Sequence, residues 1–138
     1  MKAWSDPELK APWFIGPPDW TATERTLEVR VGGEERVGGR FELGRETLFA
    51  ARCHHVVPTH RLVYVYDIHL HGVHHSVSQA TVEFSPDRHG TRLPFTQQVA
   101  FLDGTTADAG VPSRRTATER HLDRLGNLIG SVTIKTYA

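Results

Sequence analysis

Apolar and polar residues alternate through the middle of the chain, which is the pattern of strands that bury one face. In segment 60–70 (HRLVYVYDIHL) one row of alternate positions is much more apolar than the other. A slip of one residue would turn that whole row away from the core, so burial fixes the register strongly. We therefore predict a strand here with a buried row formed by Leu62, Tyr64, Tyr66 and Ile68.

Similar alternation, together with turn residues, predicts further strands on both sides of this segment. Segment 32–39 (GGEERVGG) has paired glycines at each end, which favour a turn and a bend between strands. The strands are predicted at 26–31, where Leu27, Val29 and Val31 share a face, at 46–57, and in a hairpin over 76–104 whose turn is Ser85–Gly90.

Helical patterns stand near the two ends of the chain. In segment 5–14 (SDPELKAPWF), Asp6 is a good N-cap, Pro7 suits the first helical position, and Pro12 ends the run. Near the C-terminus the apolar residues take the spacing of one helical stripe. This long helix is predicted within 111–130, with Thr118, Leu122, Leu125 and Ile129 on its buried face, Ser113 or Thr116 as its N-cap and Gly130 as its stop.

The order of these elements indicates the fold class. A short helix, about six strands and one long amphipathic helix follow one another, which implies an antiparallel sheet with the long helix across one face. The class is therefore α+β, in one domain over residues 1–138. The β-branched tail 131–138 (SVTIKTYA) is predicted either as a further short strand or as a frayed end.

Charge and cysteine content narrow the function classes. The chain has 16 basic and 16 acidic residues, so electrostatic capture of nucleic acid or of an anionic membrane is not expected. Its one cysteine, Cys53, excludes an internal disulfide and fits a reducing compartment. No N-terminal segment resembles a signal peptide, and no apolar run reaches the length that crosses a bilayer. We expect a cytoplasmic protein.

Several segments, in their order and spacing, resemble one known superfamily. They are AWSDPELKAPWF at 3–14, DWTATERTLEVRVGG at 19–33, RLVYVYDIHL at 61–70, ATVEFSPDRHGTRLPFTQQVAFLDG at 80–104 and RHLDRL at 120–125. Over about residues 3–129 the chain resembles the START/SRPBCC helix-grip superfamily, in the branch named for activators of the heat-shock protein 90 ATPase. The resemblance implies a curved antiparallel sheet that grips a long C-terminal helix. It also implies an apolar cavity between them, which the superfamily uses for lipids, polyketides and other hydrophobic molecules.

One departure from the family pattern concerns the start of the chain. That pattern places a strand and most of a helix before Ala3, so either the natural start lies upstream or the family's first strand is missing. A missing strand would leave one sheet edge unpaired. Pro94 in the last strand fits such an edge, because proline has no N–H for a partner. The tail 131–138 could fill the gap, in the same molecule or in a neighbour, and we predict a homodimer that covers the exposed edge.

The alternation of each strand predicts which side chains face the cavity. Most of these positions would also suit plain core packing, but a buried hydroxyl or amide needs a partner, which a ligand or water in an open pocket supplies. Tyr64, Tyr66 and Gln97 are therefore the most informative members of the set. The predicted cavity residues are Tyr64, Tyr66, Val82, Phe84, Phe95 and Gln97 from the sheet, with Leu122 and Leu125 from the helix.

Three functions remain open at this point. The leading one is a binding domain for a lipid-like, polyketide-like or aromatic molecule, with no cofactor and no catalysis of its own. The second is an enzyme of the cyclase or hydrolase kind, in which tyrosine or glutamine polarises a carbonyl inside the cavity. The third is a protein-interaction module of the co-chaperone kind, which rests on the branch's name, and fold does not fix function.

No catalytic set is evident from the residue pattern. No G-x-S-x-G motif presents Ser76 or Ser78 as a nucleophile. Cys53 and His54 are neighbours on a predicted strand, where adjacent side chains point to opposite faces. The neighbouring Arg114 and Arg115 are predicted to form a solvated face of the long helix rather than an anion site.

Segment 66–76 (YDIHLHGVHHS) raises the question of a metal site. A two-residue turn at Gly72 and Val73 would bring His69, His71 and His74 together on one face of a hairpin. That register would also turn the apolar row of segment 60–70 away from the core. Burial of each large apolar side chain is worth about 1.5–3 kcal/mol, so we predict an odd-length loop that contains His71 and His74, and no metal site.

Overall fold

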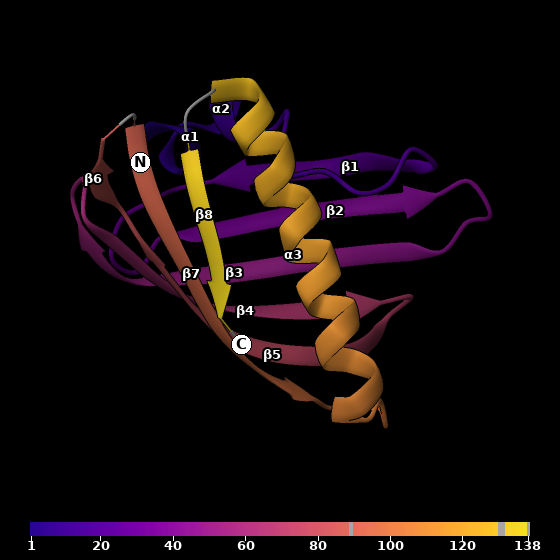
Figure 1. Cartoon of the computed structure of the whole chain (residues 1–138). Coiled ribbons are helices and arrows are strands. Elements are labelled where there is room, and N and C mark those ends of the chain that lie inside the picture. Colours follow the sequence, from indigo (N-terminus) through magenta and orange to yellow (C-terminus); the bar gives the residue numbers. More distant parts are fainter. Residues whose placement is uncertain (89, 130–131, 138) are drawn as a thin grey trace.

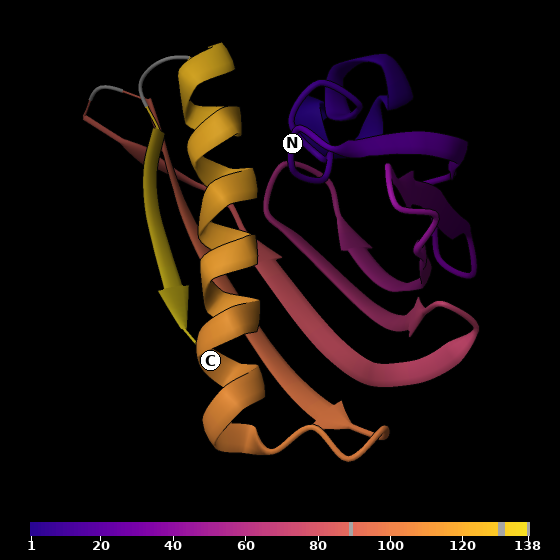
Figure 2. The same cartoon turned by 90° about the vertical axis from the view of Figure 1, so that its right-hand side faces the viewer.

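The computed structural model describes residues 1–88, 90–129 and 132–137, with side chains as far as Leu128. Three helices and eight strands form the architecture of Figures 1 and 2. The helices are α1 (Lys2–Ser5), α2 (Pro7–Lys10) and α3 (Ala107–Ile129). The strands are β1 (Trp20–Leu27), β2 (Glu34–Phe41), β3 (Glu46–Val57), β4 (Arg61–Leu70), β5 (Val73–Glu83), β6 (Ser85–Asp87), β7 (Gly90–Phe101) and β8 (Val132–Tyr137).

All strands belong to one sheet, which curls around α3 (Figure 2). Its order is β1-β2-β3-β4-β5-β7-β6, all antiparallel, and β8 runs parallel to β7. The α+β fold expected from the sequence is confirmed. The count of about six strands was too low, since β6 lies where the turn Ser85–Gly90 was predicted and the tail supplies β8.

The core lies between the sheet and the three helices. The predicted register of β4 is confirmed, because Leu62 pairs with Val82 and Tyr64 with Ala80 on the buried face. Leu62, Val82 and Ala80 have at most 3% of their surface exposed. Burial of this row therefore sets how β4 and β5 meet.

The strand predicted at 26–31 lies earlier in the chain, at Trp20–Leu27. The observed β1 ends at Leu27, and Val31 is 64% exposed. Segment 32–39 is mostly strand rather than turn and bend, with Gly38 and Gly39 inside β2. The reason is packing, because the Trp20 ring of β1 lies so close to Gly39 that a Cβ there would stand 1.9 Å from a ring carbon.

Side-chain oxygens cap the N-termini of α2 and α3. Asp6 caps α2 as predicted and accepts a hydrogen bond from the Glu8 N–H at 2.9 Å. The start of α3 was wrong in the prediction: α3 begins at Ala107 with Pro112 inside it, and Thr106 Oγ1 accepts from the Ala109 N–H at 3.3 Å. The predicted buried stripe of Thr118, Leu122 and Leu125 is confirmed, whereas the Ile129 side chain and Gly130 lie outside the described residues.

The edge of β7 is covered by the chain's own tail. β8 pairs with β7 from Thr91 opposite Val132 to Thr96 opposite Tyr137. Pro94 lies between the last β5 pair, at Phe95, and the first β6 pair, at Arg92. Its missing N–H therefore interrupts neither antiparallel ladder.

Candidate functional site

A cavity of about 110 Å³ lies between the inner face of the sheet and α3. Aromatic and aliphatic side chains from every layer form its wall, which is the usual character of a site for a hydrophobic molecule. Its lining includes Trp4, Phe49, Tyr66, Phe95, Arg114 and Leu122.

A second apolar hollow of about 230 Å³ adjoins this cavity and reaches Trp20 and Phe41 near β1 and β2. Phe14, Phe49 and His121 line both spaces. The ring of Phe14 has its centroid 4.9 Å from those of Phe49 and of His121. These three rings therefore form an aromatic partition between the cavity and the hollow.

The structure brings part of the predicted set to the cavity wall. Tyr64, Tyr66, Phe95 and Leu122 line it. The others pack in the core beside it, with 0% to 7% of their surface exposed, and they are Val82, Phe84, Gln97 and Leu125. Gln97 is committed to protein partners, since it accepts from the Tyr66 hydroxyl at 2.6 Å and donates to Thr118 Oγ1 at 2.9 Å.

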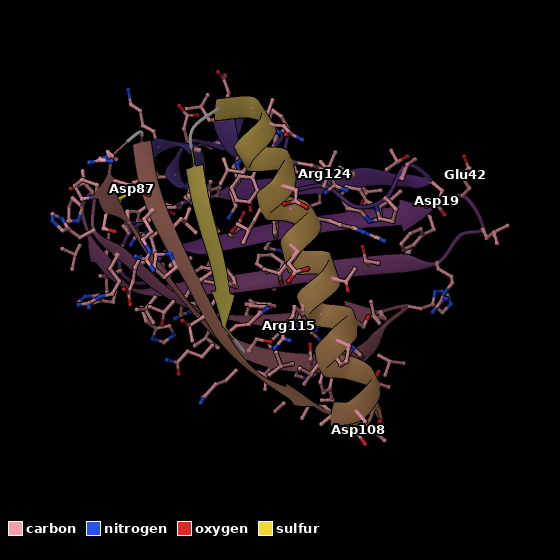
Figure 3. All side chains as sticks on the ribbon, viewed as in Figure 1. Asp19, Glu42, Asp87, Asp108, Arg115 and Arg124 are labelled. Carbon is pink, nitrogen blue, oxygen red and sulfur yellow. The ribbon has the colours of Figure 1, made fainter. Side chains whose placement is uncertain are left out.

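Arg114 is the main residue that sequence reasoning missed. Arg115 is exposed as expected (Figure 3), but Arg114 is half-buried and lines the cavity, so its assignment to a solvated face was wrong. Its Nη1 donates to Tyr66 Oη at 3.1 Å and Ser78 Oγ at 2.9 Å, and its Nη2 donates to Ser76 Oγ at 2.8 Å.

The spacing of Arg114, Ser76 and Ser78 along the sequence already indicated that these polar side chains face inward. Arg114 stands four residues before Thr118 and so continues the buried stripe of α3 by one turn. Ser76 and Ser78 likewise continue the inward row of β5, below Ala80. Arg114 was assigned to solvent although its spacing from Thr118 already placed it inside.

His121 is a half-buried imidazole between the cavity and the hollow. Burial lowers its pKa to about 4, so the ring is neutral at neutral pH. Because its partner is a carbonyl, Nε2 carries the proton and donates to the Ile15 oxygen at 3.0 Å. Arg124 donates to the same oxygen at 2.8 Å. The two side chains fasten the loop after α2 onto α3.

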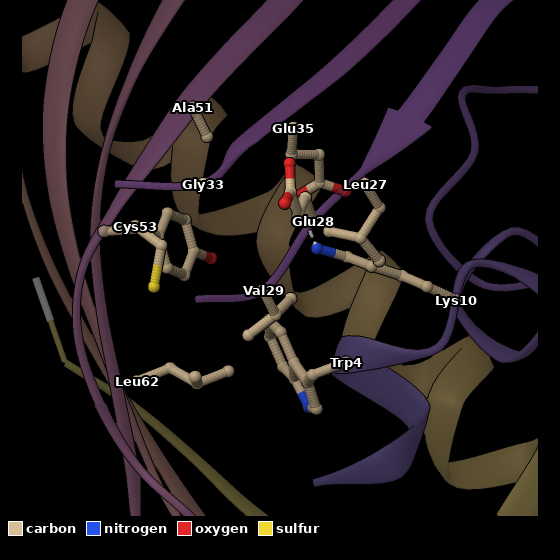
Figure 4. A pocket seen from close by; sticks show the side chains of 11 residues that line it. Trp4, Lys10, Leu27, Glu28, Val29, Gly33, Glu35, Ala51, Cys53 and Leu62 are labelled. Carbon is tan, nitrogen blue, oxygen red and sulfur yellow. Dashed lines mark hydrogen bonds and ion pairs between the residues drawn. The ribbon is translucent and has the colours of Figure 1, made fainter. Parts of the chain in front are cut away.

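A buried ion pair stands at a smaller cavity of about 30 Å³ (Figure 4). Lys10 Nζ of α2 lies 2.7 Å from Glu35 Oε1 of β2, and both side chains are less than a tenth exposed. The ammonium also lies 4.7 Å from the Phe14 ring centroid and 5.3 Å from that of Trp4. Rings and carboxylate together compensate the buried charge.

Two further groups at this smaller cavity, the Cys53 thiol and the Tyr64 phenol, have raised pKa values. Burial raises the pKa of the Cys53 thiol, and it raises the pKa of the Tyr64 phenol well above its ordinary value. Cys53 is buried whereas His54 is exposed, so the two side chains do not form a thiol–imidazole pair. A protonated thiol of this kind is a poor nucleophile.

The histidine-rich hairpin tip reaches the register that buries the apolar row through a two-residue turn and a β-bulge, not through the predicted odd-length loop. Leu70 pairs with Val73 across a turn of His71 and Gly72, both with positive φ. The loop is thus two residues long rather than odd, and it contains His71 but not His74. His75 is an extra residue, a β-bulge, which restores the core register from Ser76 onward.

The outer face of this hairpin tip carries a compact polar group. His74 stacks on His69 with ring centroids 4.5 Å apart, and its Nε2 lies 2.8 Å from Asp67 Oδ1. The hydrogen bond from His75 holds the pKa of the Asp103 carboxyl well below its usual range. Among the described side chains, no group of three or more His, Cys, Asp or Glu residues has the arrangement that holds a metal ion.

Within the described part of the chain, no helix combines the length and the apolar character needed to cross a membrane. No curated protein matches the sequence.

Comparison with solved structures and family models places this fold among known proteins. An uncharacterized protein from Rhizobium leguminosarum is 33% identical with a TM-score of 0.77, over 90% of this chain and 80% of that one. The Mll3558 protein from Rhizobium loti is 28% identical with a TM-score of 0.78, over 91% and 83%. The AHSA1-like protein from Aeromonas hydrophila shares the fold, at 22% identity and a TM-score of 0.65, over 93% and 80%. The model of the family "Activator of Hsp90 ATPase homolog 1-like protein" matches residues 2–130, and the chain therefore belongs to this family.

Proposed function

We propose that this protein binds a hydrophobic small molecule, lipid-like, polyketide-like or aromatic, between its sheet and α3. The observation that carries the proposal is the cavity of about 110 Å³, whose wall is aromatic and aliphatic over most of its extent. The family's fold commonly binds hydrophobic ligands, which supports the same conclusion.

The proposed contacts follow from the geometry of the wall. Tyr64, Tyr66, Phe95 and Leu122 would touch the ligand. Val82, Phe84, Gln97 and Leu125 would hold these residues from behind, since they are buried in the same core. The adjoining hollow offers room for a longer apolar body once the aromatic partition moves.

A fluorescent probe tests the proposal. N-phenyl-1-naphthylamine, a neutral apolar dye, should brighten on the native protein. Ala117→Trp, at an exposed position on the cavity wall, should weaken its affinity about tenfold or more by occupying the space. Ala109→Trp, exposed on α3 outside that lining, is the matched control and should leave binding unchanged. No binding to the native protein, or equal binding to the Ala117 variant, would reject the cavity as the site.

One observation favours a second function, catalysis in the same cavity. A neutral imidazole at a cavity wall can accept a proton as a general base, and His121 lines the cavity with Nε2 bound to the Ile15 oxygen. On this reading the native protein hydrolyses 4-nitrophenyl esters and His121→Gln does not, although the variant still binds the dye. Equal rates in both proteins would remove His121 from any role in turnover.

The assembly and location expected from the sequence stay predictions. A homodimer was expected at the unpaired edge, but β8 pairs with β7 there in the same chain, which favours a monomer at that edge. Light scattering of the full chain would decide between the two. The cytoplasm remains the proposed location, on the basis of the single cysteine.

A further inference from the structure

We propose that the ligand carries a carboxylate, and that Arg114, positioned by Ser76 and Ser78, binds this group at the polar end of the cavity. The inference rests on the proposed binding function and narrows it to one ligand class. That class is an acid with a compact aromatic or aliphatic body.

The first argument concerns charge. Arg114 is half-buried, and its three acceptors are the neutral hydroxyls of Tyr66, Ser76 and Ser78. No carboxylate among the described residues forms an ion pair with it. A guanidinium withdrawn from water without a counter-charge is costly. A bound anion would remove that cost.

The surface arginines of this sheet show the contrast. Arg36, Arg40 and Arg52 each lie within 2.9 Å of a glutamate oxygen on a neighbouring residue of the sheet, with 44% to 59% of each side chain exposed. An ion pair between exposed groups contributes little to stability. Arg114 is more shielded from solvent than these arginines, yet its acceptors are hydroxyl groups.

The second argument concerns unused hydrogens. Nη1 of Arg114 has two acceptors and Nη2 has one, and Nε has no hydrogen-bond acceptor among the described residues. The guanidinium therefore keeps donor capacity on its Nε–Nη2 side. In a guanidinium, that edge is a fork that can hold a carboxylate by two parallel hydrogen bonds.

The serines hold the guanidinium from behind. Each accepts a hydrogen bond from Arg114. Ser76 is 0% and Ser78 2% exposed, and both lie behind the residues that line the cavity. Tyr66 acts only as an acceptor here, because its hydrogen goes to Gln97.

The third argument concerns position. The guanidinium carbon lies 5.6 Å from the Tyr66 ring centroid and 5.7 Å from that of Phe101, so two aromatic faces hold its plane. Arg114 lines the cavity together with Phe49, Phe95 and Leu122. A ligand whose acid group meets Arg114 would therefore place its apolar body against these side chains.

Calorimetry with a matched pair of probes tests the inference. 2-Naphthoate and 2-naphthamide have nearly the same size and shape, and they differ in charge. The native protein should bind the acid about tenfold more tightly than the amide, as expected for a charge-assisted bidentate contact. Arg114→Gln should reduce the affinity for the acid to that for the amide, whose own affinity it leaves within about threefold. Arg115→Gln, next along α3 and exposed, is the control and should bind both probes as the native protein does.

The outcomes separate this inference from the proposed function. Equal affinity of the native protein for both probes overturns the carboxylate and leaves hydrophobic binding intact. Binding of neither probe overturns both proposals. Ser78→Ala keeps the arginine but removes one of the hydroxyls that position its guanidinium, so a loss of affinity for the acid alone supports the site even where Arg114→Gln fails to fold. An unchanged acid-to-amide ratio in the Ser78 variant would count against it.

Discussion

At the scale of single residues, a side chain that lines the cavity also contributes to the stability of the fold. His121 lines the cavity, packs on Phe14 and donates to the Ile15 carbonyl. Its protonation therefore places a charge in a buried region that offers it no carboxylate among the described contacts. The free energy of unfolding should respond to pH through this residue.

Acid should destabilise the protein through His121. Its pKa is lowered from 6.5 to about 4, so between these values the unfolded chain binds a proton that the folded chain does not. Stability is thus complete above about pH 6.5 and falls as the pH drops towards 4, by about 3 kcal/mol at most, since one pH unit is worth about 1.4 kcal/mol. Urea unfolding of the native protein and His121→Gln at several pH values measures the effect. Parallel pH profiles for the two proteins would contradict it.

Two neighbouring glycines offer a residue-scale test of packing. A Cβ at Gly39 would stand 1.9 Å from the Trp20 ring, whereas at Gly38 its nearest neighbour would be the Thr23 hydroxyl at 3.3 Å. Gly39→Ala should therefore lower the free energy of unfolding by about 1–3 kcal/mol, the usual cost of overpacking. Gly38→Ala is the matched control and should cost much less. Thermal melts of both variants compare them, and similar losses would show that the Trp20 ring moves aside freely.

At the scale of elements, the N-terminal helices depend on one charged contact. The Lys10–Glu35 pair joins α2 to β2 inside the core, surrounded by the rings of Trp4 and Phe14. Removal of either partner leaves a buried charge without compensation, which is more costly than the loss of the pair as a whole.

Lys10→Met should therefore destabilise the protein by about 3–5 kcal/mol, because Glu35 is left buried and unpaired. The double variant Lys10→Met with Glu35→Leu should recover much of that loss. A double-mutant cycle from urea unfolding gives the coupling energy between the two side chains. If the double variant is less stable than Lys10→Met alone, the pair is not the source of the effect.

Elements governed by local periodicity could be predicted from the sequence, and elements governed by distant packing could not. The apolar row of β4 and the stripe of α3 followed from spacing, as did the Asp6 cap. The position of β2 depended on how close Trp20 comes to Gly39, which only the assembled sheet reveals. The start of α3 depended on Thr106, which lies upstream of the caps expected at Ser113 or Thr116.

The candidate site was predictable in part for the same reason. Its apolar wall followed from alternation, but the polar end escaped because Arg114 and Ser78 have side chains that usually face water. Their buried positions became evident only when strand and helix were brought together. Lys10 and Glu35 are similar, since nothing in their local sequence links α2 to β2.

At the scale of the whole molecule, the β7 edge of the sheet is covered by β8. β8 lies along β7 and satisfies backbone groups that would otherwise be open to another chain. The strand runs parallel to β7, in contrast to the antiparallel pairing from β1 to β7. It follows α3 directly, so the C-terminal segment protects the edge beside the cavity.

Removal of residues 131–138 should expose this edge. The truncated chain should self-associate more strongly than the full chain at the same concentration, because an unpaired strand invites edge-to-edge pairing. Light scattering coupled to gel filtration measures the mass of each form over a range of concentrations. Identical masses at every concentration would show that β8 has no protective role.

The β-bulge at His75 has a consequence for how this chain can change over generations. One added residue there inverts the facing of β5 relative to its turn, so that Ser76 and Ser78 point inward rather than His75 and Val77. Loss of the His75 codon would remove the one residue that the ladder does not need, so that Ser76 would still pair with Ile68 and Ser78 with Tyr66. A one-residue deletion at this point of the hairpin therefore leaves the inward row of β5, and the hydroxyls beside Arg114, as they are.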